Sequence, residues 1–197
     1  MPGLEGYRFV ELLSQNDRVR VVRSQVSRDG GTVILKQLRR SPRPENVAWL
    51  EQELALIQSL DVPGVVRARG LMDVHGEPTL VLDDPGGSSL EHAHSSAPIS
   101  FEEKLDIGLR LTAIVGTIHR SGVVHRGLQP SGILWNSADD RLAVIDFSLA
   151  TRATRDLASS VGAGALVGTP HYVSPEQTGR LGMVVDRRSD LYSLGGT

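Results

Sequence analysis

The sequence predicts an α+β protein built from two lobes, a β-rich first lobe with one helix and a mainly helical second lobe. Two β-rich runs, VRVVRSQV and TVILKQL, flank the turn signal SRDGG, and this pattern favours a hairpin. Apolar residues then recur at helical spacing over residues 46–60 and again over residues 100–122. We therefore expect a first lobe over residues 1–85 and a second over residues 86–197, which together form one domain of about residues 7–197.

The first lobe opens with strand-like sequence from Tyr7 to about Leu38. The run NVAWLEQELALIQSL has its apolar residues at helical spacing, and the following DVPG contains residues that stop a helix. Two further strands are expected around residues 65–74 and 78–84, with HGEP as the turn between them. PGGSS then has the composition of a flexible connection, so it marks the passage between the lobes.

The second lobe opens with its own helix signals. Ser100 can cap the helix N-terminus, Glu103 stands at the capping-box position, and Gly122 can close the C-terminus. Short β runs follow at GILWN and LAVIDF, joined by the turn SADDR, and residues 148–168 are predicted to form a long mobile loop. The predicted apolar face of the helix consists of Leu105, Leu109, Ile114, Val115 and Ile118.

Composition excludes several classes of function. Hydrophobic residues make up 40% of the chain and charged residues 22%, as in ordinary soluble proteins, and a net charge of −2 gives no general attraction to nucleic acid or acidic membranes. The absence of cysteine excludes disulfides, thiolate zinc sites and a cysteine nucleophile. The first ten residues lack the features of a secretion signal, and no apolar run is long enough to span a membrane. We expect a cytoplasmic protein without a nucleic-acid or membrane partner.

Five motifs follow one another along the chain: VILK, HRGLQPSGIL, IDFSLA, GTPHYVSPEQ and DRRSDLYSLGG. Together they resemble the third-strand lysine motif, the catalytic loop, the metal-binding motif, the end of the activation segment and the following helix of eukaryotic-type Ser/Thr protein kinases. The resemblance covers essentially the whole chain. The run YVSPEQTGRLGMVVDRRSDLYSLGGT is also similar to the N-terminal kinase-like domain of large bacterial signalling proteins that continue into an ATPase module and a sensor histidine kinase.

The resemblance implies a nucleotide site between the lobes, with ATP and Mg²⁺ as its cofactors. Lys36 would hold the α- and β-phosphates, and Glu53 would pair with it, with Glu51 as an alternative half a turn away. Asp146 would be a metal ligand, although one carboxylate without an oxygen partner binds Mg²⁺ poorly. On the hinge side of the site, Leu82 would be the gatekeeper, and Asp83 and Asp84 would form the hinge.

Other retained residues would serve the fold. His125 and Phe147 would pack in the column of side chains that joins the lobes, and Arg126 would neutralise a phosphate or bind carbonyl groups. Asp190 would tie the final helix back to the catalytic loop. Ile34, where the family commonly has alanine, is either a packed core residue or a partial plug of the nucleotide pocket.

The reactive groups of the family are missing from the same motifs. Gly127 stands where the family has its catalytic aspartate, and losing such a base usually costs about 10²–10⁴ in rate. Gln129 replaces the lysine that steadies the transferred phosphoryl group, and Gly132 replaces the asparagine that holds a second metal. Ser148 replaces the glycine of the metal-binding motif. The three glycines of the phosphate-covering loop are replaced by Ser14, Asn16 and Val19.

These losses favour a pseudokinase, a regulatory or interaction module of bacterial signal transduction. Its partner would be a protein, either a regulator or the histidine kinase and ATPase modules of a longer parent. Two alternatives stay open. The chain could be a weak ATP-dependent Ser/Thr kinase in which another carboxylate, Asp139 or Asp140, replaces the base that is missing at Gly127. It could also bind ATP without turnover and act as a switch.

The resemblance also implies further helices after Thr197, so the second lobe is expected to be incomplete and the chain to be a fragment or a truncated reading frame. Glu176 of the Ser-Pro-Glu motif at 174–176 would then lack the arginine with which it normally pairs. The segment before this motif is either a merely polar loop or a phosphorylated segment opposite Arg126. The candidate phosphorylation sites are Thr151, Thr154, Ser159, Ser160 and Thr169.

Overall fold

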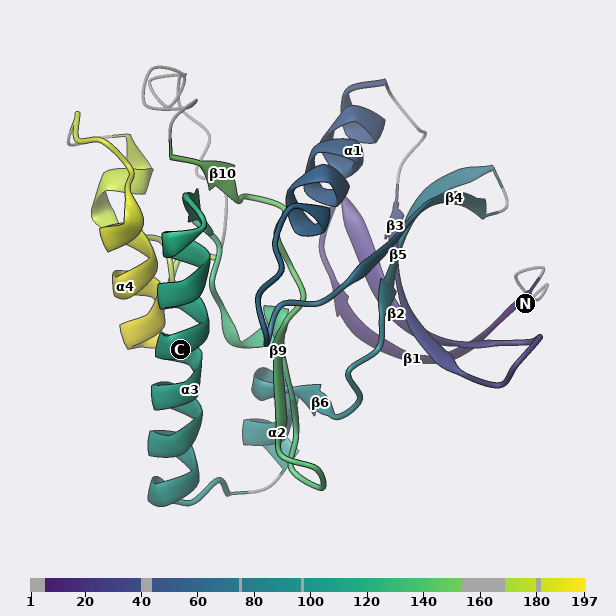
Figure 1. Cartoon of the computed structure of the whole chain (residues 1–197), viewed down its shortest axis with the longest axis horizontal. Helices are drawn as coiled ribbons and strands as arrows, with labels where there is room; N and C mark the ends of the chain where they lie inside the picture. The colour runs from purple at the N-terminus through teal and green to yellow at the C-terminus, as the bar shows by residue number, and fades with distance from the viewer. Residues whose placement is uncertain (1–5, 40–43, 75, 97, 154–168, 180–181) are drawn as a thin grey trace.

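A five-stranded antiparallel sheet with the strand order β1-β2-β3-β5-β4 forms the first lobe (Figure 1). The computed structural model describes residues 6–39, 44–74, 76–96, 98–153, 169–179 and 182–197. The strands are β1 Tyr7–Gln15, β2 Val19–Val26, β3 Thr32–Leu38, β4 Ala68–Val74 and β5 Glu77–Asp83. The hairpin predicted from VRVVRSQV and TVILKQL is confirmed, because β2 and β3 cover these residues and pair antiparallel.

Alternation along β2 and β3 sorts their side chains onto two faces of the sheet. Val21 lies opposite Lys36, and Arg23 lies opposite Ile34. Val21 and Ile34 belong to the core that runs between the lobes. The face toward the second lobe therefore carries two cations among its apolar residues. The opposite face has its own small cluster, made of Val22, Val33, Leu35 and Val81.

Helix α1, Pro44–Gln58, packs against β4 and β5 (Figure 1). It begins and ends two residues earlier than the helix predicted over residues 46–60. Leu50 and Ile57 are fully buried, and Glu53 is buried between them. Residues spaced three and four apart share one face of a helix. Helix α1 therefore presents a carboxylate to the sheet from within its apolar face.

The second lobe places α3 and α4 side by side, and short strands lie between these helices and the first lobe (Figure 1). In the described residues, β6, β8 and β9 form one small sheet, and β7 pairs with β10. The helices are α2 Leu90–Ser96, α3 Phe101–Arg120 and α4 Arg187–Gly196, with 3₁₀ turns at Pro130–Gly132 and Pro175–Thr178. The strands are β6 Ser88–Ser89, β7 Val123–Val124, β8 Ile133–Asn136, β9 Arg141–Val144 and β10 Thr151–Arg152.

The caps predicted for α3 are confirmed. Ser100 Oγ accepts a hydrogen bond from Glu103 N, and the Glu103 carboxylate accepts one from Ser100 N over 2.8 Å. At the other end Gly122 has a φ of 74°, the left-handed conformation that commonly follows a helix C-terminus. Both ends of the longest described helix are thus set by local sequence.

The apolar face predicted for α3 is partly wrong. Leu105 and Leu109 are 54% and 63% exposed, and Ile114 is half-buried. The helix contains two overlapping apolar patterns, and periodicity alone does not decide which of them meets the core. The buried stripe consists of Ile107, Leu111, Val115 and Ile118.

Two short elements lie where the sequence predicts a connection and a loop. Helix α2 follows PGGSS almost directly, and its sequence LEHAHSS has little apolar periodicity, with Leu90 as its buried residue. Strand β10 pairs with β7 inside the segment predicted to be a mobile loop, so this part of the prediction is wrong. Residues 154–168 of that segment lie outside the described residues.

The connection between the lobes passes close to β8. Gly87 has a φ of 72°, and an added Cβ would lie 2.2 Å from the carbonyl oxygen of Trp135. Both the backbone conformation and the close approach require glycine here. The connection is therefore fixed against the second lobe, while the predicted lobe boundary at residue 85 stays a prediction.

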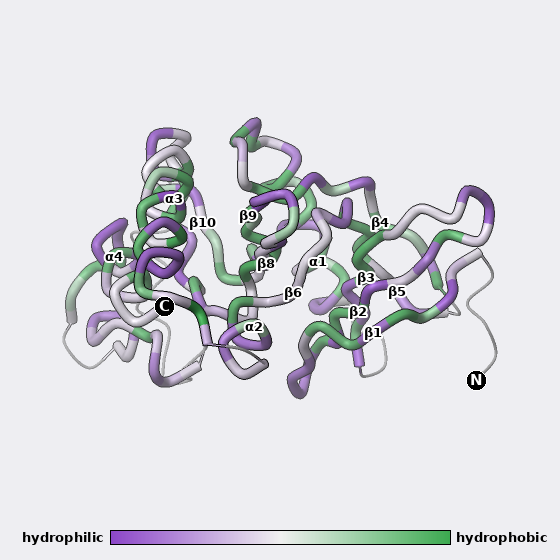
Figure 2. Tube along the Cα trace, turned by 90° about the horizontal axis from the view of Figure 1, so that it is seen from below, coloured by the Kyte–Doolittle hydropathy of each residue, from purple (hydrophilic) through white to green (hydrophobic). Residues whose placement is uncertain are grey.

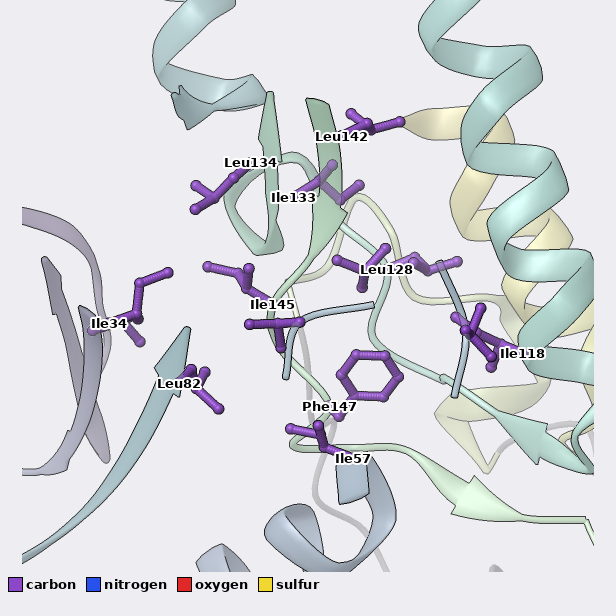
Figure 3. Packing of buried hydrophobic residues seen from close by; sticks show 14 of the residues in the cluster. Ile34, Ile57, Leu82, Ile118, Leu128, Ile133, Leu134, Leu142, Ile145 and Phe147 are labelled. Carbon is purple, nitrogen blue, oxygen red and sulfur yellow. The ribbon is translucent and has the colours of Figure 1, made fainter. Parts of the chain in front are cut away.

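One hydrophobic cluster runs through both lobes (Figure 3). Ile34 and Leu82 reach it from the first-lobe sheet, and Leu134 and Ile145 contribute to it from the second lobe (Figure 3). Fully burying a side chain of this size stabilises a fold by roughly 1.5–3 kcal/mol. The shared core therefore helps to hold the lobes together.

Helix α3 interleaves hydrophilic and hydrophobic residues along its length (Figure 2). This mixture is typical of a helix with one side in a core and one side in water. None of the helices in the described ranges is long and apolar enough to cross a membrane.

Candidate functional site

Lys36 lies at the centre of the candidate site, buried between the sheet and α1. Its Nζ lies 2.8 Å from both carboxylate oxygens of Glu53 and 2.8 Å from Oδ1 of Asp146. Lys36 is 1% exposed and Glu53 is 3% exposed, whereas Glu51 is exposed. The structure thus brings together three predicted residues from β3, α1 and the segment after β9, and it places Glu53 rather than Glu51 on the lysine.

The two carboxylates share one ammonium group and respond to it differently. Burial would raise the pKa of Asp146, but Lys36 and the hydrogen bonds from Ser148 outweigh it and lower the pKa to about 2. Burial raises the pKa of Glu53 against the attraction of Lys36, and the negative charge of Asp146 adds to this rise. Burial would also lower the pKa of Lys36, but the carboxylates outweigh it and raise this pKa. Lys36 is therefore held as a cation that protein groups already neutralise.

Hydrogen bonds fix the segment after β9. Phe147 N donates to Glu53 Oε1 over 3.0 Å, so the carboxylate that binds Lys36 also binds this backbone. Ser148 N donates to Asp146 Oδ1 over 3.1 Å. The serine that replaces a glycine of the family motif is thus accommodated in a turn that closes on Asp146.

Trp49 is a site residue that sequence reasoning missed. Its Nε1 donates to the Ser148 carbonyl oxygen over 2.8 Å, and Lys36 Nζ lies 5.1 Å from its ring centroid, within the range of a cation–π contact. A signal was available, because Trp49 precedes Glu53 by four residues and therefore shares its face of α1. Helix α1 thus forms hydrogen bonds with the segment after β9 through two side chains, those of Trp49 and Glu53.

Asp190 of α4 holds the loop that follows β7. Its fully buried carboxylate accepts hydrogen bonds from His125 N over 2.8 Å and from Arg126 N over 2.6 Å, and it lies 2.7 Å from His119 Nε2. Arg126 has a φ of 63°, which residues other than glycine rarely adopt. The bonds to Asp190 offset the cost of this conformation, so protein groups stabilise the shape of the loop.

His125 and Phe147 pack against each other as predicted. Their ring centroids lie 4.7 Å apart, and both side chains are buried. Burial lowers the pKa of His125, so the neutral ring is favoured. Figure 3 shows Phe147 close to Ile57 of α1, which places the ring between the two lobes. Both residues therefore serve the core.

Gly127 and Gly132 leave the loop without reactive side chains at the two predicted positions. An added Cβ at Gly127 would lie 3.2 Å from Leu149 Cδ1, and one at Gly132 would lie 3.3 Å from Asp146 Cβ. Both distances are tight, so Leu149 or Asp146 would have to move by a few tenths of an ångström. The chain's own side chains partly fill the space that a carboxylate or amide would occupy.

A cleft of about 330 Å³ opens in front of this loop. Residues 126–129 form its loop side, and no side chain among them can act as a base at neutral pH. The carboxylates in the lining are Asp17, on the turn between β1 and β2, and Asp146, which is bound to Lys36. The remaining lining residues are Asn16, Arg18, Val19, Trp49, Ser148, Leu149, Thr169, Tyr172 and Val173.

The turn between β1 and β2 satisfies its own backbone. Asn16 Oδ1 accepts hydrogen bonds from Arg18 N over 2.8 Å and from Val19 N over 2.9 Å. Asn16 N in turn donates to the Val19 carbonyl oxygen over 3.0 Å. In a loop that covers phosphates such N–H groups face the ligand. Here the side chain at one of the predicted glycine positions uses two of them.

The predicted hinge residues are engaged by other groups of the protein. Leu82 is fully buried, and it lies opposite Ile34, which is also fully buried. This burial agrees with the interpretation of Ile34 as a packed core residue. Asp83 pairs with Arg69 over 2.7 Å at the surface. The Asp84 side chain is 1% exposed. None of these side chains is left free toward the cleft.

The described residues do not fit bound Mg-ATP in the way that the resemblance implies. Asp146 is the predicted metal ligand, but its Oδ1 binds Lys36. Gly132 contributes no side-chain oxygen beside it. Within the described ranges, no group of three or more His, Cys, Asp or Glu residues is arranged to hold a metal ion. A phosphate would compete with the carboxylates of Glu53 and Asp146 for the ammonium group of Lys36.

The segment before α4 is joined to the loop. Thr169 Oγ1 donates to Gln129 Oε1, and Gln177 Nε2 donates to the Arg126 carbonyl oxygen over 2.7 Å. Glu176, expected to lack an arginine partner, accepts a hydrogen bond from Ser189 Oγ over 2.5 Å. Of the other candidate phosphorylation sites, Thr151 lies in β10, whereas Thr154, Ser159 and Ser160 lie outside the described residues.

Known proteins with similar sequences include bacterial serine/threonine-protein kinases. The serine/threonine-protein kinase Pkn2 of Myxococcus xanthus is 32% identical over 148 residues, which is 74% of this chain and 18% of Pkn2. A probable serine/threonine-protein kinase of Streptomyces coelicolor is 29% identical over 196 residues, 96% of this chain and 29% of its own length. The serine/threonine-protein kinase PknB of Mycobacterium tuberculosis is 30% identical over 185 residues, 93% of this chain and 27% of PknB. The chain thus spans less than a third of the length of these curated relatives.

The family match covers nearly all of the fold described above. The protein kinase domain matches residues 10–197, which is nearly the whole chain. It includes the sheet, the Lys36–Glu53 pair, the loop held by Asp190 and helix α4. The protein belongs to the protein kinase family, with bacterial serine/threonine kinases among its relatives.

Proposed function

We propose that this protein is a pseudokinase, a protein kinase domain that acts by binding in bacterial signal transduction and does not transfer phosphoryl groups. The observation that carries the proposal is the loop side of the cleft, residues 126–129, which offers no acceptor for the proton of a substrate hydroxyl. The loop is nevertheless held in shape by Asp190. A loop that keeps its conformation but has lost its reactive side chains can still bind a partner protein.

The energetic effect of the missing groups is large. Loss of a general base costs about 10²–10⁴ in rate, which corresponds to about 3–5 kcal/mol of barrier. The other phosphate-binding groups are engaged as well, because Lys36 binds two carboxylates and Asn16 binds the N–H groups of its own turn. A phosphate would compete with Asp146 for Lys36 and with Asn16 for the N–H groups of its turn.

The partner that we propose is a protein. It is either a separate regulator or the histidine kinase and ATPase modules of a longer parent, and the similarity of the run from Tyr172 to Thr197 to such parents supports the second form. A net charge of −2 gives no reason to expect a nucleic acid instead.

Phosphoryl transfer from radiolabelled ATP tests the proposal. The chain is incubated with Mg²⁺, ATP and a mixture of protein substrates, beside a Lys36→Met variant. We expect the same background incorporation from both proteins, because residues 126–129 offer no base in either of them. Incorporation that Lys36→Met abolishes would overturn the pseudokinase.

The weak-kinase alternative depends on Asp139 or Asp140 as the base. Both lie on the turn between β8 and β9, where Asp139 pairs with Arg141 and Asp140 with Arg110. Neither is among the residues that line the cleft. A double Asp139→Asn/Asp140→Asn variant should therefore match the unchanged chain in the same assay, and a loss of transfer would favour the alternative.

An ATP-binding switch is the second candidate function. The formed Lys36–Glu53 pair favours it, because this pair is the arrangement that presents the lysine to phosphates in active kinases. A ligand at 100 times its Kd stabilises the folded state by about 2.7 kcal/mol. A rise in melting temperature with ATP that is lost in Lys36→Met would support this candidate, and no rise would support a nucleotide-free module.

A further inference from the structure

Arg23 is a buried cation on the same face of the sheet as the interlobe core. It lies opposite Ile34 in the ladder between β2 and β3, and directly opposed residues of an antiparallel pair project to the same side. Ile34 and Val21 belong to the interlobe cluster, whereas Val22 belongs to the cluster on the other face. Arg23 is 8% exposed, so its guanidinium forms part of the wall between the sheet and the second lobe.

Both carboxylate oxygens of Asp84 bind this guanidinium. Arg23 Nε lies 2.7 Å from Oδ2, and one terminal nitrogen lies 3.0 Å from Oδ1, which makes a two-pronged ion pair. Asp84 Oδ1 also accepts a hydrogen bond from Gly86 N over 2.9 Å. The second terminal nitrogen of Arg23 pairs with Glu11 of β1. One guanidinium therefore ties β1 and β2 to the connection between the lobes.

This connection has few backbone donors left for a ligand. Asp83 N donates to the Arg67 carbonyl oxygen over 2.8 Å, Pro85 has no N–H, and Gly86 N is used by Asp84. A purine base presents ring nitrogens that accept hydrogen bonds along its edge, so it binds where donors line an apolar slot. At three of the four positions from 83 to 86 the donor is either engaged or missing.

We propose that the Arg23–Asp84 ion pair is a latch that excludes purine nucleotides from the space between the lobes. A flat slot for a purine requires β2 to move away from the connection, and this movement breaks a buried two-pronged ion pair. Ile34 and Leu82 are fully buried beside it and would have to separate as well. The inference rests on the proposed function, since it assumes a domain that works by binding, and it goes further by naming the residues that decide which ligand class is refused.

The variant that opens the latch must remove both charges. Removing Arg23 or Asp84 alone would leave the other as an unpaired buried charge, which destabilises a fold by itself. The double variant Arg23→Met/Asp84→Asn avoids this and keeps an oxygen acceptor for Gly86 N. The matched control is Arg188→Met/Asp186→Asn, because this ion pair has a similar distance of 2.9 Å but lies away from the connection, with side chains that are 70% and 37% exposed.

Titration with the fluorescent nucleotide methylanthraniloyl-ATP, with and without Mg²⁺ and with adenosine as competitor, tests the latch. We expect no saturable binding to the unchanged chain or to the control, and saturable, adenosine-competed binding to the latch variant that is tighter by about tenfold or more. The same affinity for the unchanged chain and the latch variant, whether measurable or absent in both, would overturn the proposal.

Two further measurements keep the result interpretable. Cooperative melting by circular dichroism confirms that the latch variant is folded, and if it is not, Arg23→Lys takes its place, since lysine keeps the charge but not the two-pronged geometry. Phosphoryl transfer by the same proteins separates the two proposals. Transfer by the unchanged chain that Lys36→Met abolishes would overturn the pseudokinase proposal. The latch proposal is tested only by the ratio of nucleotide affinities between the latch variant and the unchanged chain.

Discussion

Trp49 Nε1 and the Ser148 carbonyl oxygen lie 2.8 Å apart, and this hydrogen bond ties the middle of α1 to the segment that follows Phe147. The contact joins residues 99 positions apart in the sequence. It supplements the bond from Phe147 N to Glu53. Helix α1 is therefore held against the second lobe by its own side chains.

Replacing Trp49 with phenylalanine removes this bond and keeps an aromatic ring on Lys36. One hydrogen bond contributes about 0.5–1.5 kcal/mol, so we expect the free energy of unfolding in urea to fall by about 1 kcal/mol. Trp135→Phe is the matched control, because Trp135 Nε1 is buried and has no hydrogen-bond partner among the described residues. An equal loss in both variants would show that the Trp49 bond does not contribute.

Lys36→Met leaves the carboxylates of Glu53 and Asp146 without their shared cation. Removing one partner of a buried ion pair costs about 3–5 kcal/mol, and we expect a destabilisation of this size in urea unfolding. Lys104→Met serves as the control, since Lys104 is exposed on α3 and should change stability by about 0.5 kcal/mol or less. A loss below about 1 kcal/mol for Lys36→Met would contradict the cluster.

The Asp146 carboxylate predicts a pH dependence with a defined sign. Its pKa is lowered to about 2 from 3.8, so its contribution is complete above pH 4 and is lost as the pH falls toward 2. The shift corresponds to about 2 kcal/mol. The difference in unfolding free energy between the unchanged chain and Asp146→Asn should therefore shrink by about this amount between pH 5 and pH 2. A constant difference across this range would be inconsistent with the paired state of Asp146.

Asp190→Asn places an amide where two backbone N–H groups need an acceptor. Hydrogen bonds to a charged group contribute about 1.5–3 kcal/mol, and we expect a destabilisation of about 2–3 kcal/mol. Hydrogen exchange should accelerate at the His125 and Arg126 amides in particular, because these two donate to Asp190. Asp106→Asn, which disrupts an exposed ion pair, is the control and should leave both amides unchanged.

Gly87→Ala and Gly108→Ala should act in opposite directions. A Cβ at Gly87 would meet the Trp135 carbonyl oxygen at 2.2 Å and would also need a φ of 72°, so we expect a loss of about 2 kcal/mol or more. A Cβ at Gly108 meets nothing within 4 Å inside α3, and alanine there should stabilise the helix by about 0.5–1 kcal/mol. Thermal melts of the two variants test both expectations. A Gly87→Ala protein as stable as the unchanged chain would contradict the close approach of Gly87 to the Trp135 carbonyl oxygen.

Much of the fold could be predicted from the sequence because its signals are local. β2 and β3 follow from β-branched runs around a glycine turn, and the α3 caps follow from Ser100, Glu103 and Gly122. The buried stripe of α3 could not be chosen, because two apolar patterns overlap on that helix. Helix α2 could not be predicted because its seven residues carry little periodicity of their own.

The residues of the candidate site likewise fall into those that the sequence predicted and those that it did not. Lys36, Glu53 and Asp146 could be predicted from motifs whose order is fixed along the chain. Trp49 was missed although its spacing from Glu53 places both on one face of α1. The Arg23–Asp84 pair could not be predicted, because it depends on which distant side chains meet in the folded chain. Arg23 in particular reads as an ordinary strand arginine until its pairing with β3 places it on the inner face.

The sequence separation of the contacts in the candidate site determines the order in which these contacts form during folding. β1, β2 and β3 are joined by hairpins and pair through local contacts, whereas Lys36 meets Asp146 across 110 positions and Asp190 meets His125 across 65. Contacts between distant positions form slowly, because the loop between them must close first. The β1–β3 part of the sheet and the Lys36–Glu53 pair, whose residues are 17 positions apart, are therefore expected early. Asp146 is expected to join Lys36 later, when the segment after β9 docks.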